Sequence, residues 1–317
     1  MSTIDEILKK IKKAKNIVLL THENPDGDAI GSSLAIYNQL KTMKKDVELI
    51  VPKYAKIYET LPLMSEAKET GSRKKYDLAI SLDCATVKLL NGWSNYFEDA
   101  STRIVIDHHS TNSMYGDFNY VDLSAPACAQ VIYMMFKHYR WKITPEIGTC
   151  LMTGIITDTG GFQYSGVSKE TFEITSELLT AGVNISKIYK QVLETHSRAS
   201  FELKKIALDR MEFLEDNKVT FTYITKEDEE KVNASTGDYE GIVNEGRVIE
   251  NVEVSIFLHE MDAGYKASLR ANSYVNVSDV CLMFGGGGHI RAAGATMQGT
   301  PEEIKEKLLV EVRRQLK

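Results

Sequence analysis

Four short apolar runs near the start of the chain constrain its fold more than any other feature. They read "NIVLLT" (16–21), "DVELIV" (46–51), "DLAISLD" (77–83) and "TRIVID" (102–107). Nearly continuous apolar runs of this length are typical of strands buried on both faces of a parallel sheet. The segment between the first two runs, "IGSSLAIYNQLKTM" (30–43), has apolar residues near helical spacing. The pattern predicts an α/β fold in which helices cover a parallel sheet.

The rest of the chain predicts more helices and then a second set of strands. Further helices are expected at 125–139 and 145–157, residues 186–214 look mostly helical with a break near 195–200, and strands are expected at 218–224, 251–260 and 264–271. The chain closes with a helix in which Thr300 is the N-cap, Pro301 the first helical residue and Glu303 the partner of a capping box. We therefore expect a catalytic domain at 1–190, a helical connector at 191–214 and a smaller α/β domain at 215–317.

Composition excludes several classes of protein. A net charge of −6 over 317 residues does not suit a protein that coats long nucleic acid. The sequence contains neither a signal-peptide h-region nor 18 consecutive apolar residues, so no membrane association is expected. The four cysteines form no CxxC pair, which argues against a zinc ribbon and favours a reduced, cytoplasmic protein.

Polar clusters follow the predicted elements where a site would be expected. Ligands of an open parallel sheet bind beyond the carboxyl ends of its strands. Each residue alone has an ordinary explanation as a turn or a helix cap, but four such clusters at equivalent ends are harder to explain by chance. The clusters comprise His22, Asp26 and Asp28; Asp83; Asp107, His108 and His109; and Asp158 after the helix at 145–157.

The residue types in these clusters indicate the chemistry. Carboxylates and imidazoles without thiolates suit Mn²⁺, Mg²⁺, Fe²⁺ or Co²⁺. Four aspartates and two histidines are too many for one ion but suit two. Two ions about 3.5–4 Å apart form a clamp that hydrolyses phosphoesters. Cys84 would point away from its neighbour Asp83, so we expect it to pack and not to ligate.

A second candidate site lies near the C-terminus. Consecutive glycines let backbone N–H groups approach an anion, although a flexible turn would have the same composition. The run contains Gly285, Gly286, Gly287 and Gly288. His289 follows it, and Arg270 lies on a neighbouring predicted strand, which favours a phosphate site. Arg291 is equally well a solvated structural residue.

The motifs resemble a known family. "HENPDGDAIGSS", "LDCA", "DHHS" and "TDTGGF" resemble the four N-terminal motifs of the DHH phosphoesterases. "FGGGGHIRAAGATM" (284–297), preceded by "SLRAN" (268–272), resembles the associated DHHA1 domain. The chain looks most like the family's oligoribonuclease and pAp phosphatase branch. That likeness implies a Mn²⁺-dependent hydrolase of very short RNA and pAp, working as a homodimer.

The resemblance also implies roles for individual residues. One Mn²⁺ would be held by His22, Asp26 and Asp83, and the other by Asp28, Asp83, His108 and Asp158. Asp107 would orient its neighbour, and His109 would face the substrate phosphate. Arg270 and His289, beside Gly286, Gly287 and Gly288, would grip the end of a short substrate. Weaker candidates are Asn24 and Ser32 near the metals, Arg198 in the connector, and Phe162, Phe284 and Tyr265 as base-stacking or core residues.

Other functions remain open from the sequence. The nearest alternative is hydrolysis of linear or cyclic dinucleotides such as pApA and cyclic-di-AMP. An inorganic pyrophosphatase would use a similar metal site, but the "GGGGH" and "SLRAN" motifs favour nucleotide substrates. A nucleotide-binding protein without turnover would require the loss of a ligand, and all the expected ligands are present.

Overall fold

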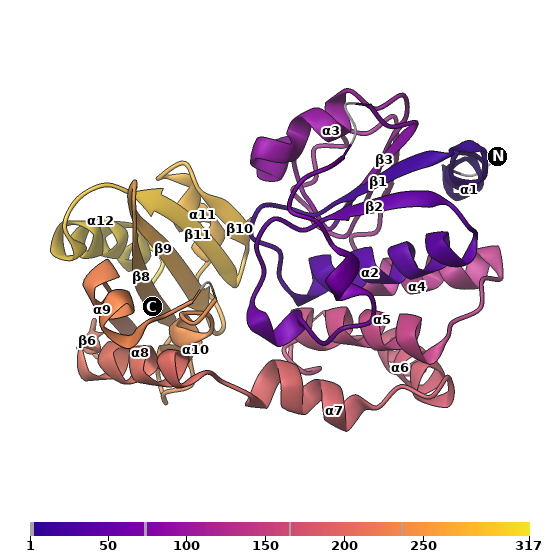
Figure 1. Cartoon of the computed structure of the whole chain (residues 1–317). Coiled ribbons are helices and arrows are strands. Elements are labelled where there is room, and N and C mark those ends of the chain that lie inside the picture. Colours follow the sequence, from indigo (N-terminus) through magenta and orange to yellow (C-terminus); the bar gives the residue numbers. More distant parts are fainter. Residues whose placement is uncertain (1–2, 73–74, 165, 236) are drawn as a thin grey trace. The chain divides into compact units, whose positions relative to one another are not determined.

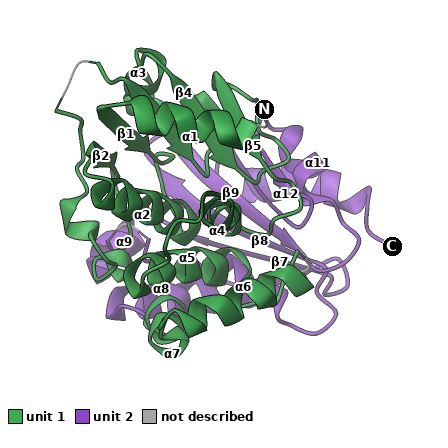
Figure 2. Cartoon of the chain, turned by 90° about the vertical axis from the view of Figure 1, so that its right-hand side faces the viewer, with its two compact units in different colours: residues 1–195 green, residues 196–317 purple. Residues whose placement is uncertain are grey.

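The chain forms two compact units, which a computed structural model describes at residues 3–72, 75–164, 166–235 and 237–317. The first unit comprises residues 1–195 and the second residues 196–317 (Figure 2). In the part of the chain that the structure covers, no helix has the length and apolarity needed to cross a bilayer.

A five-stranded parallel sheet forms the centre of the first unit and confirms the predicted fold class. The strand order is β2-β1-β3-β4-β5. The strands are β1 (Asn16–Leu20), β2 (Asp46–Ile50), β3 (Leu78–Leu82), β4 (Arg103–Asp107) and β5 (Phe118–Val121). The sequence analysis missed β5, which is short and lies at the sheet edge with only half-buried residues.

Both faces of this sheet are covered, as the apolar runs predict. In β1, Ile17 and Leu19 pack into the core on one face, and Val18 and Leu20 into a separate core on the other. The first face carries α2 (Gly27–Thr42), α4 (Cys128–Tyr139) and α5 (Pro145–Asp158), and the second carries α3 (Ser94–Glu98) (Figure 1). The unit also contains α1 (Thr3–Lys13), α6 (Lys169–Thr180), α7 (Ile185–Tyr189), a π-helix at Lys190–Glu194 and 3₁₀ segments at Lys56–Tyr58, Met64–Glu66 and Val87–Trp93.

The second unit is built on a mixed sheet with the order β10-β11-β9-β8-β7-β6. The pair β7 and β8 is parallel, and the other pairs are antiparallel. Its strands are β6 (Glu212–Leu214), β7 (Val219–Ile224), β8 (Val254–Met261), β9 (Gly264–Ala271), β10 (Gly287–His289) and β11 (Ala292–Met297). Its helices are α8 (Arg198–Asp209), α9 (Lys226–Val232), α10 (Ile242–Arg247), α11 (Val277–Leu282) and α12 (Pro301–Arg313).

Some predicted boundaries are confirmed and others are wrong. The Thr300–Glu303 capping box is present at the start of α12. Residues 212–214 form strand β6, although the sequence suggested a helix there, because they pair with β7 at the sheet edge. The helix predicted to start at residue 30 starts at Gly27, because the Asp26 side chain caps it by accepting hydrogen bonds from two backbone N–H groups.

Candidate metal centre

The loop after β1 places two aspartates in different roles at the start of α2. Asp26 Oδ1 lies 3.0 Å from the backbone nitrogens of both Asp28 and Ala29. Asp26 is exposed, whereas Asp28 is fully buried one residue into the helix. The sequence "DGD" therefore supplies one carboxylate at the surface and one in the interior.

Asp28 lies against the first residues of α4. Its Oδ2 accepts a hydrogen bond of 2.5 Å from the Cys128 backbone nitrogen, and its Oδ1 accepts one of 2.9 Å from the Ala129 backbone nitrogen. The positive end of the helix dipole thus fixes the carboxylate. Burial, together with the nearby Asp83 and Asp158 carboxylates, nevertheless raises the pKa of Asp28 well above its usual range.

Close packing of α2 on α5 brings in a residue that is distant in the sequence. A Cβ on Gly31 would lie 2.4 Å from the Cys150 carbonyl oxygen, and one on Gly154 would lie 2.5 Å from Asp28 Oδ1. These glycines permit a contact distance that a larger residue would prevent. Gly27, at the start of α2, contacts Thr157 near the end of α5, so Asp158 comes to lie beside Asp28.

Asp83 is the first residue after β3 and has a left-handed backbone with φ of 53°. It is 2% exposed, and within the described part of the chain its Oδ1 makes no hydrogen bond. That oxygen lies 3.5 Å from both His108 Nε2 and His109 Nδ1. Burial alone would raise the pKa of Asp83, but these imidazoles lower it to about 2.

The ring of His108 has a fixed orientation. Its Nδ1 lies 3.1 Å from the Ala125 carbonyl oxygen, to which it can only donate. Nε2 therefore faces the carboxylates, at 3.3 Å from Asp158 Oδ2, 3.5 Å from Asp83 Oδ1 and 3.8 Å from Asp28 Oδ2. When Nδ1 donates its N–H in this way, Nε2 keeps the lone pair that would bind a metal. This is the usual arrangement of a metal-ligating histidine.

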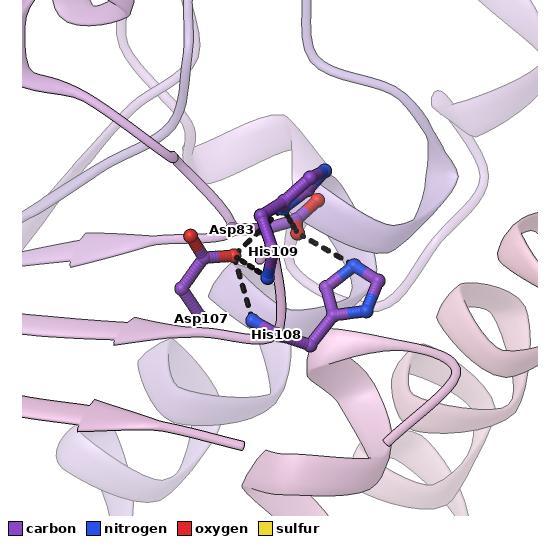
Figure 3. A group of neighbouring side chains, drawn as sticks. All are labelled: Asp83, Asp107, His108 and His109. Atoms are coloured by element: carbon purple, nitrogen blue, oxygen red, sulfur yellow. Dashed lines mark hydrogen bonds and ion pairs between the residues drawn. The ribbon is translucent and has the colours of Figure 1, made fainter. Parts of the chain in front are cut away.

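Asp107 points one carboxylate oxygen toward His108 and His109 and holds the backbone of the motif (Figure 3). Its Oδ1 accepts hydrogen bonds from the His108 backbone nitrogen (2.7 Å), the His109 backbone nitrogen (3.3 Å) and His109 Nδ1 (2.8 Å). Its Oδ2 accepts one of 2.6 Å from Asn112 Nδ2. Asp107 is thus placed to orient His109, whose side chain is 29% exposed.

The donor atoms form groups that could each hold a cation. His22, Asp26 and Asp83 bring ligand atoms within 4.8 Å of one another, and Asp28, His108 and Asp158 do the same. A third group consists of Asp83, Asp107, His108 and His109. Crowded buried carboxylates repel one another unless positive charge compensates them. The unbonded Asp83 Oδ1 and the oxygen and nitrogen donors therefore fit a hard divalent cation.

Comparison with known proteins places this site in a family. Residues 16–155 match the DHH family, N-terminal domain, and residues 184–317 match the DHHA1 domain. A Thermus thermophilus protein named bifunctional oligoribonuclease and PAP phosphatase NrnA is 30% identical, over 100% of this chain and 94% of its own. The chain belongs to the DHH phosphoesterase family. The relatives named oligoribonuclease and PAP phosphatase indicate that the chain is a hydrolase acting on phosphoester bonds.

Two other similar proteins extend this result. A Bacillus subtilis protein of the same name is 23% identical over 94% of both chains. A solved structure, an exopolyphosphatase-related protein from Bacteroides fragilis, is 30% identical with a TM-score of 0.90, covering 98% of this chain and 96% of its own. The resemblance to the DHH and DHHA1 motifs in the sequence is thereby confirmed.

In the DHHA1 region, two predicted substrate residues share one face of the sheet. His289 pairs with Ala292, which pairs with Arg270, so the three lie in one row across β10, β11 and β9. Residues in one such row point to the same side. The flanking Leu269 and Ala271 are buried on the opposite face.

The glycine run of this DHH phosphoesterase has a packing role that the sequence did not reveal. A Cβ on Gly286 would lie 2.2 Å from the Gly294 carbonyl oxygen, and one on Gly288 would lie 2.5 Å from the Ala292 carbonyl oxygen. Only glycine allows this close approach to β11. Gly287, in contrast, has only Leu282 Cδ2 nearby, at 4.0 Å from an ideal Cβ. The last two glycines of the run, Gly287 and Gly288, belong to strand β10, so the run is not a simple turn.

The weaker candidates have mostly structural surroundings. Arg291 Nη1 donates to the Val275 carbonyl oxygen at 2.7 Å, and Tyr265 is buried in the core. Phe162 stacks on Phe172 with ring centroids 5.5 Å apart. Phe284 is half-buried against the second-unit core, and Cys84 is buried in a core of the first unit. Arg198 is exposed at the start of α8, and Asn24 is exposed in the loop after β1. The Ser32 Oγ donates to Asp28 Oδ1 at 3.2 Å.

Sequence reasoning missed Asn112 and Tyr115, which contact the loops of the metal centre. The only signal was their position shortly after "DHHS" (107–110), where they resemble ordinary loop residues.

Proposed function

We propose that this DHH phosphoesterase hydrolyses very short RNA to mononucleotides and removes phosphate from pAp, using two divalent cations. The observation that carries the proposal is the pair of three-residue donor groups around the buried carboxylate of Asp83. The substrate class rests on the 30% identical relative, which is named an oligoribonuclease and PAP phosphatase.

The ligand assignment follows the two groups and adds Asp83 to the second, because its Oδ1 lies 3.5 Å from His108 Nε2. His22, Asp26 and Asp83 would hold one Mn²⁺, and Asp28, Asp83, His108 and Asp158 the other, with Asp83 as the bridge. The same oxygen and nitrogen donors would also accept Mg²⁺, Co²⁺ or Fe²⁺. Bound there, the cations supply a water of lowered pKa and neutralise charge on the phosphoryl oxygens.

The chain itself supplies the proton for the leaving oxygen in this proposal. Asp107 accepts a hydrogen bond from His109 Nδ1, so the substrate proton would be carried by Nε2. Burial lowers the pKa of His109, but the Asp107 and Asp83 carboxylates outweigh it and raise that pKa overall. A protonated imidazole suits a general acid or an electrostatic partner of the phosphate.

Substrate length would be set by recognition of the terminal phosphate. Arg270 and His289 lie in one row of the second sheet and carry donors that suit a phosphate. Local recognition of this kind is compatible with a net charge of −6, because no long backbone has to be held.

Product analysis with Mn²⁺ tests the proposal. The panel consists of a 5′-labelled RNA trimer, pAp, pApA, cyclic-di-AMP, pyrophosphate and polyphosphate. Fast release of mononucleotides from the trimer, together with cleavage of pAp, is the expected result. Activity confined to pApA or cyclic-di-AMP would indicate turnover of a dinucleotide messenger instead. Pyrophosphate or polyphosphate as the best substrate would overturn the nucleotide assignment.

A further inference from the structure

Residues 112–115 connect the two loops that carry the central site residues. Asn112 Nδ2 donates to Asp107 Oδ2 at 2.6 Å and lies 3.3 Å from the Cys84 carbonyl oxygen. Its Oδ1 accepts a hydrogen bond of 2.7 Å from the Met114 backbone nitrogen. One amide side chain thus contacts the last residue of β4, the loop after β3 and its own segment.

The same segment fixes the backbone that follows Asp83. The Cys84 carbonyl oxygen accepts a hydrogen bond of 2.9 Å from the Tyr115 hydroxyl, and the Ala85 carbonyl oxygen accepts one of 2.9 Å from the Ser113 backbone nitrogen. Asp83 itself has a left-handed backbone that needs such support. The direction of its carboxylate therefore depends on residues 112–115.

We infer that Asn112 is a positioning residue that acts on the reaction through Asp107 and His109. Asp107 is fully buried, and the hydrogen bond to its Oδ2 comes from Asn112. A buried carboxylate oxygen that loses its donor must rotate toward another or admit water, because leaving it unpaired is costly. Either change moves Oδ1, which holds His109 Nδ1 at 2.8 Å.

The inference rests on the proposed function, in which His109 protonates the leaving oxygen, and it adds a specific expectation. Misplacing the acid slows only those reactions whose leaving group needs a proton. The 3′-oxygen or 5′-oxygen of a nucleotide needs one, whereas 4-nitrophenolate leaves without one. The penalty for altering Asn112 should therefore depend on the leaving group, which a general loss of structure would not produce.

The test compares Asn112→Leu with wild type on pApA and on the 4-nitrophenyl ester of AMP. We expect kcat on pApA to fall about 10- to 100-fold, the range typical for residues that orient site ligands, with little change in KM. On the nitrophenyl ester, the decrease in log kcat should be less than about a third of the decrease on pApA. Thermal unfolding and calorimetric Mn²⁺ titration of the same samples show whether fold and cation binding persist.

The matched control is Asn119→Leu. Asn119 is also half-buried, but its amide only closes a local turn with the Gly116 backbone, at 2.9 Å for both hydrogen bonds. It should show no leaving-group dependence. Tyr115→Phe removes the hydrogen bond to the Cys84 carbonyl oxygen and leaves Asp107 unchanged. It should lower kcat for both substrates by the same factor.

His109→Gln separates the two proposals. If it shows leaving-group dependence and Asn112→Leu slows both substrates equally, the role of Asn112 is wrong and the proposed function stands. If neither variant shows leaving-group dependence, the acid role of His109 fails and the inference falls with it. An Asn112→Leu protein with wild-type kcat on pApA would also overturn the inference.

Discussion

At the scale of single residues, Asp83 has the most demanding position in the candidate metal centre. Its Oδ1 lies between the imidazoles of His108 and His109, and Asp83 belongs to two of the three donor groups. Asp83→Asn keeps the shape and tolerates the left-handed backbone, which an alanine would not. We expect at least about a thousandfold loss of kcat, since several kcal/mol of transition-state stabilisation disappear.

Circular dichroism and Mn²⁺ titration check this prediction. The fold should persist while cation binding weakens. The control is Asp77→Asn, because Asp77 accepts hydrogen bonds from the Lys15 and Asn16 backbone nitrogens at the opposite end of β1. Turnover close to wild type in Asp83→Asn would rule out a bridging role.

The crowded carboxylates also predict how stability depends on pH in the cation-free protein. Burial raises the pKa of Asp158 from 3.8 to about 7. Burial would lower the pKa of His108, but Asp83 raises it from 6.5 to about 11. Both groups hold protons more tightly when folded, so their stabilisation is present at low pH and is lost as the pH rises. The low pKa of Asp83, about 2, stabilises the folded chain above about pH 4, and this contribution is lost only as the pH falls below that, so it does not affect the range above pH 5.

Thermal unfolding after EDTA treatment measures this effect. The melting temperature should fall between pH 5.5 and pH 8. Added Mn²⁺ should raise it more at pH 8, because protons compete with the cation for the same atoms. A cation-free protein that is more stable at pH 8 would contradict the pKa assignments.

The candidate ligands could be named from the sequence because they follow apolar runs whose strand character is unambiguous. Their surroundings could not be named. The hydrogen bonds from Cys128 and Ala129 to Asp28 join residues about a hundred positions apart, and no local pattern predicts such a contact. The left-handed backbone of Asp83 was equally invisible, since aspartate is common in ordinary turns.

At the scale of elements, the contact of α2 with α5 decides the geometry of the site. Gly154→Ala would place a methyl group 2.5 Å from Asp28 Oδ1 and 2.7 Å from Ala129 Cβ. Because the helices must move apart, we expect a stability loss of about 1–3 kcal/mol and weaker cation binding. Gly92→Ala is the control, as its Cβ would meet nothing within 4 Å.

Urea unfolding and Mn²⁺ titration of both glycine variants provide the measurement. Equal stability and equal cation affinity for Gly154→Ala and wild type would show that Asp28 does not depend on this helix contact.

Strands with continuous apolar runs and the long capped helix α12 were predictable, because local pattern and final burial agree in them. The short edge strands β5, β6 and β10 were not. Each has at most four residues and exists because a neighbouring strand offers hydrogen bonds. Tertiary context overrides local preference most easily in such segments.

At the scale of the whole molecule, the candidate ligands and the candidate substrate residues belong to different units. The ligands lie between His22 and Asp158, and Arg270 and His289 lie in residues 196–317. His289→Ala should therefore raise KM for pAp about 10-fold, the effect of one lost hydrogen bond to a charged group. Calorimetric Mn²⁺ affinity should not change.

His138→Ala is the control for this variant, since His138 is an exposed residue of α4 that contacts Asp5. Loss of Mn²⁺ affinity in His289→Ala, in parallel with the rise in KM, would refute a separate substrate subsite.

The confinement of every candidate ligand to one unit has a consequence for how such enzymes diversify. On the proposed substrate role of Arg270 and His289, sequence drift in β9, β10 and β11 would alter which phosphate compounds are accepted, while the candidate ligands of the first unit would stay unchanged. In a library randomised only in residues 264–297, most variants should therefore remain active, and some should prefer a different substrate. The same number of changes spread over residues 22–158 should mostly yield inactive ones.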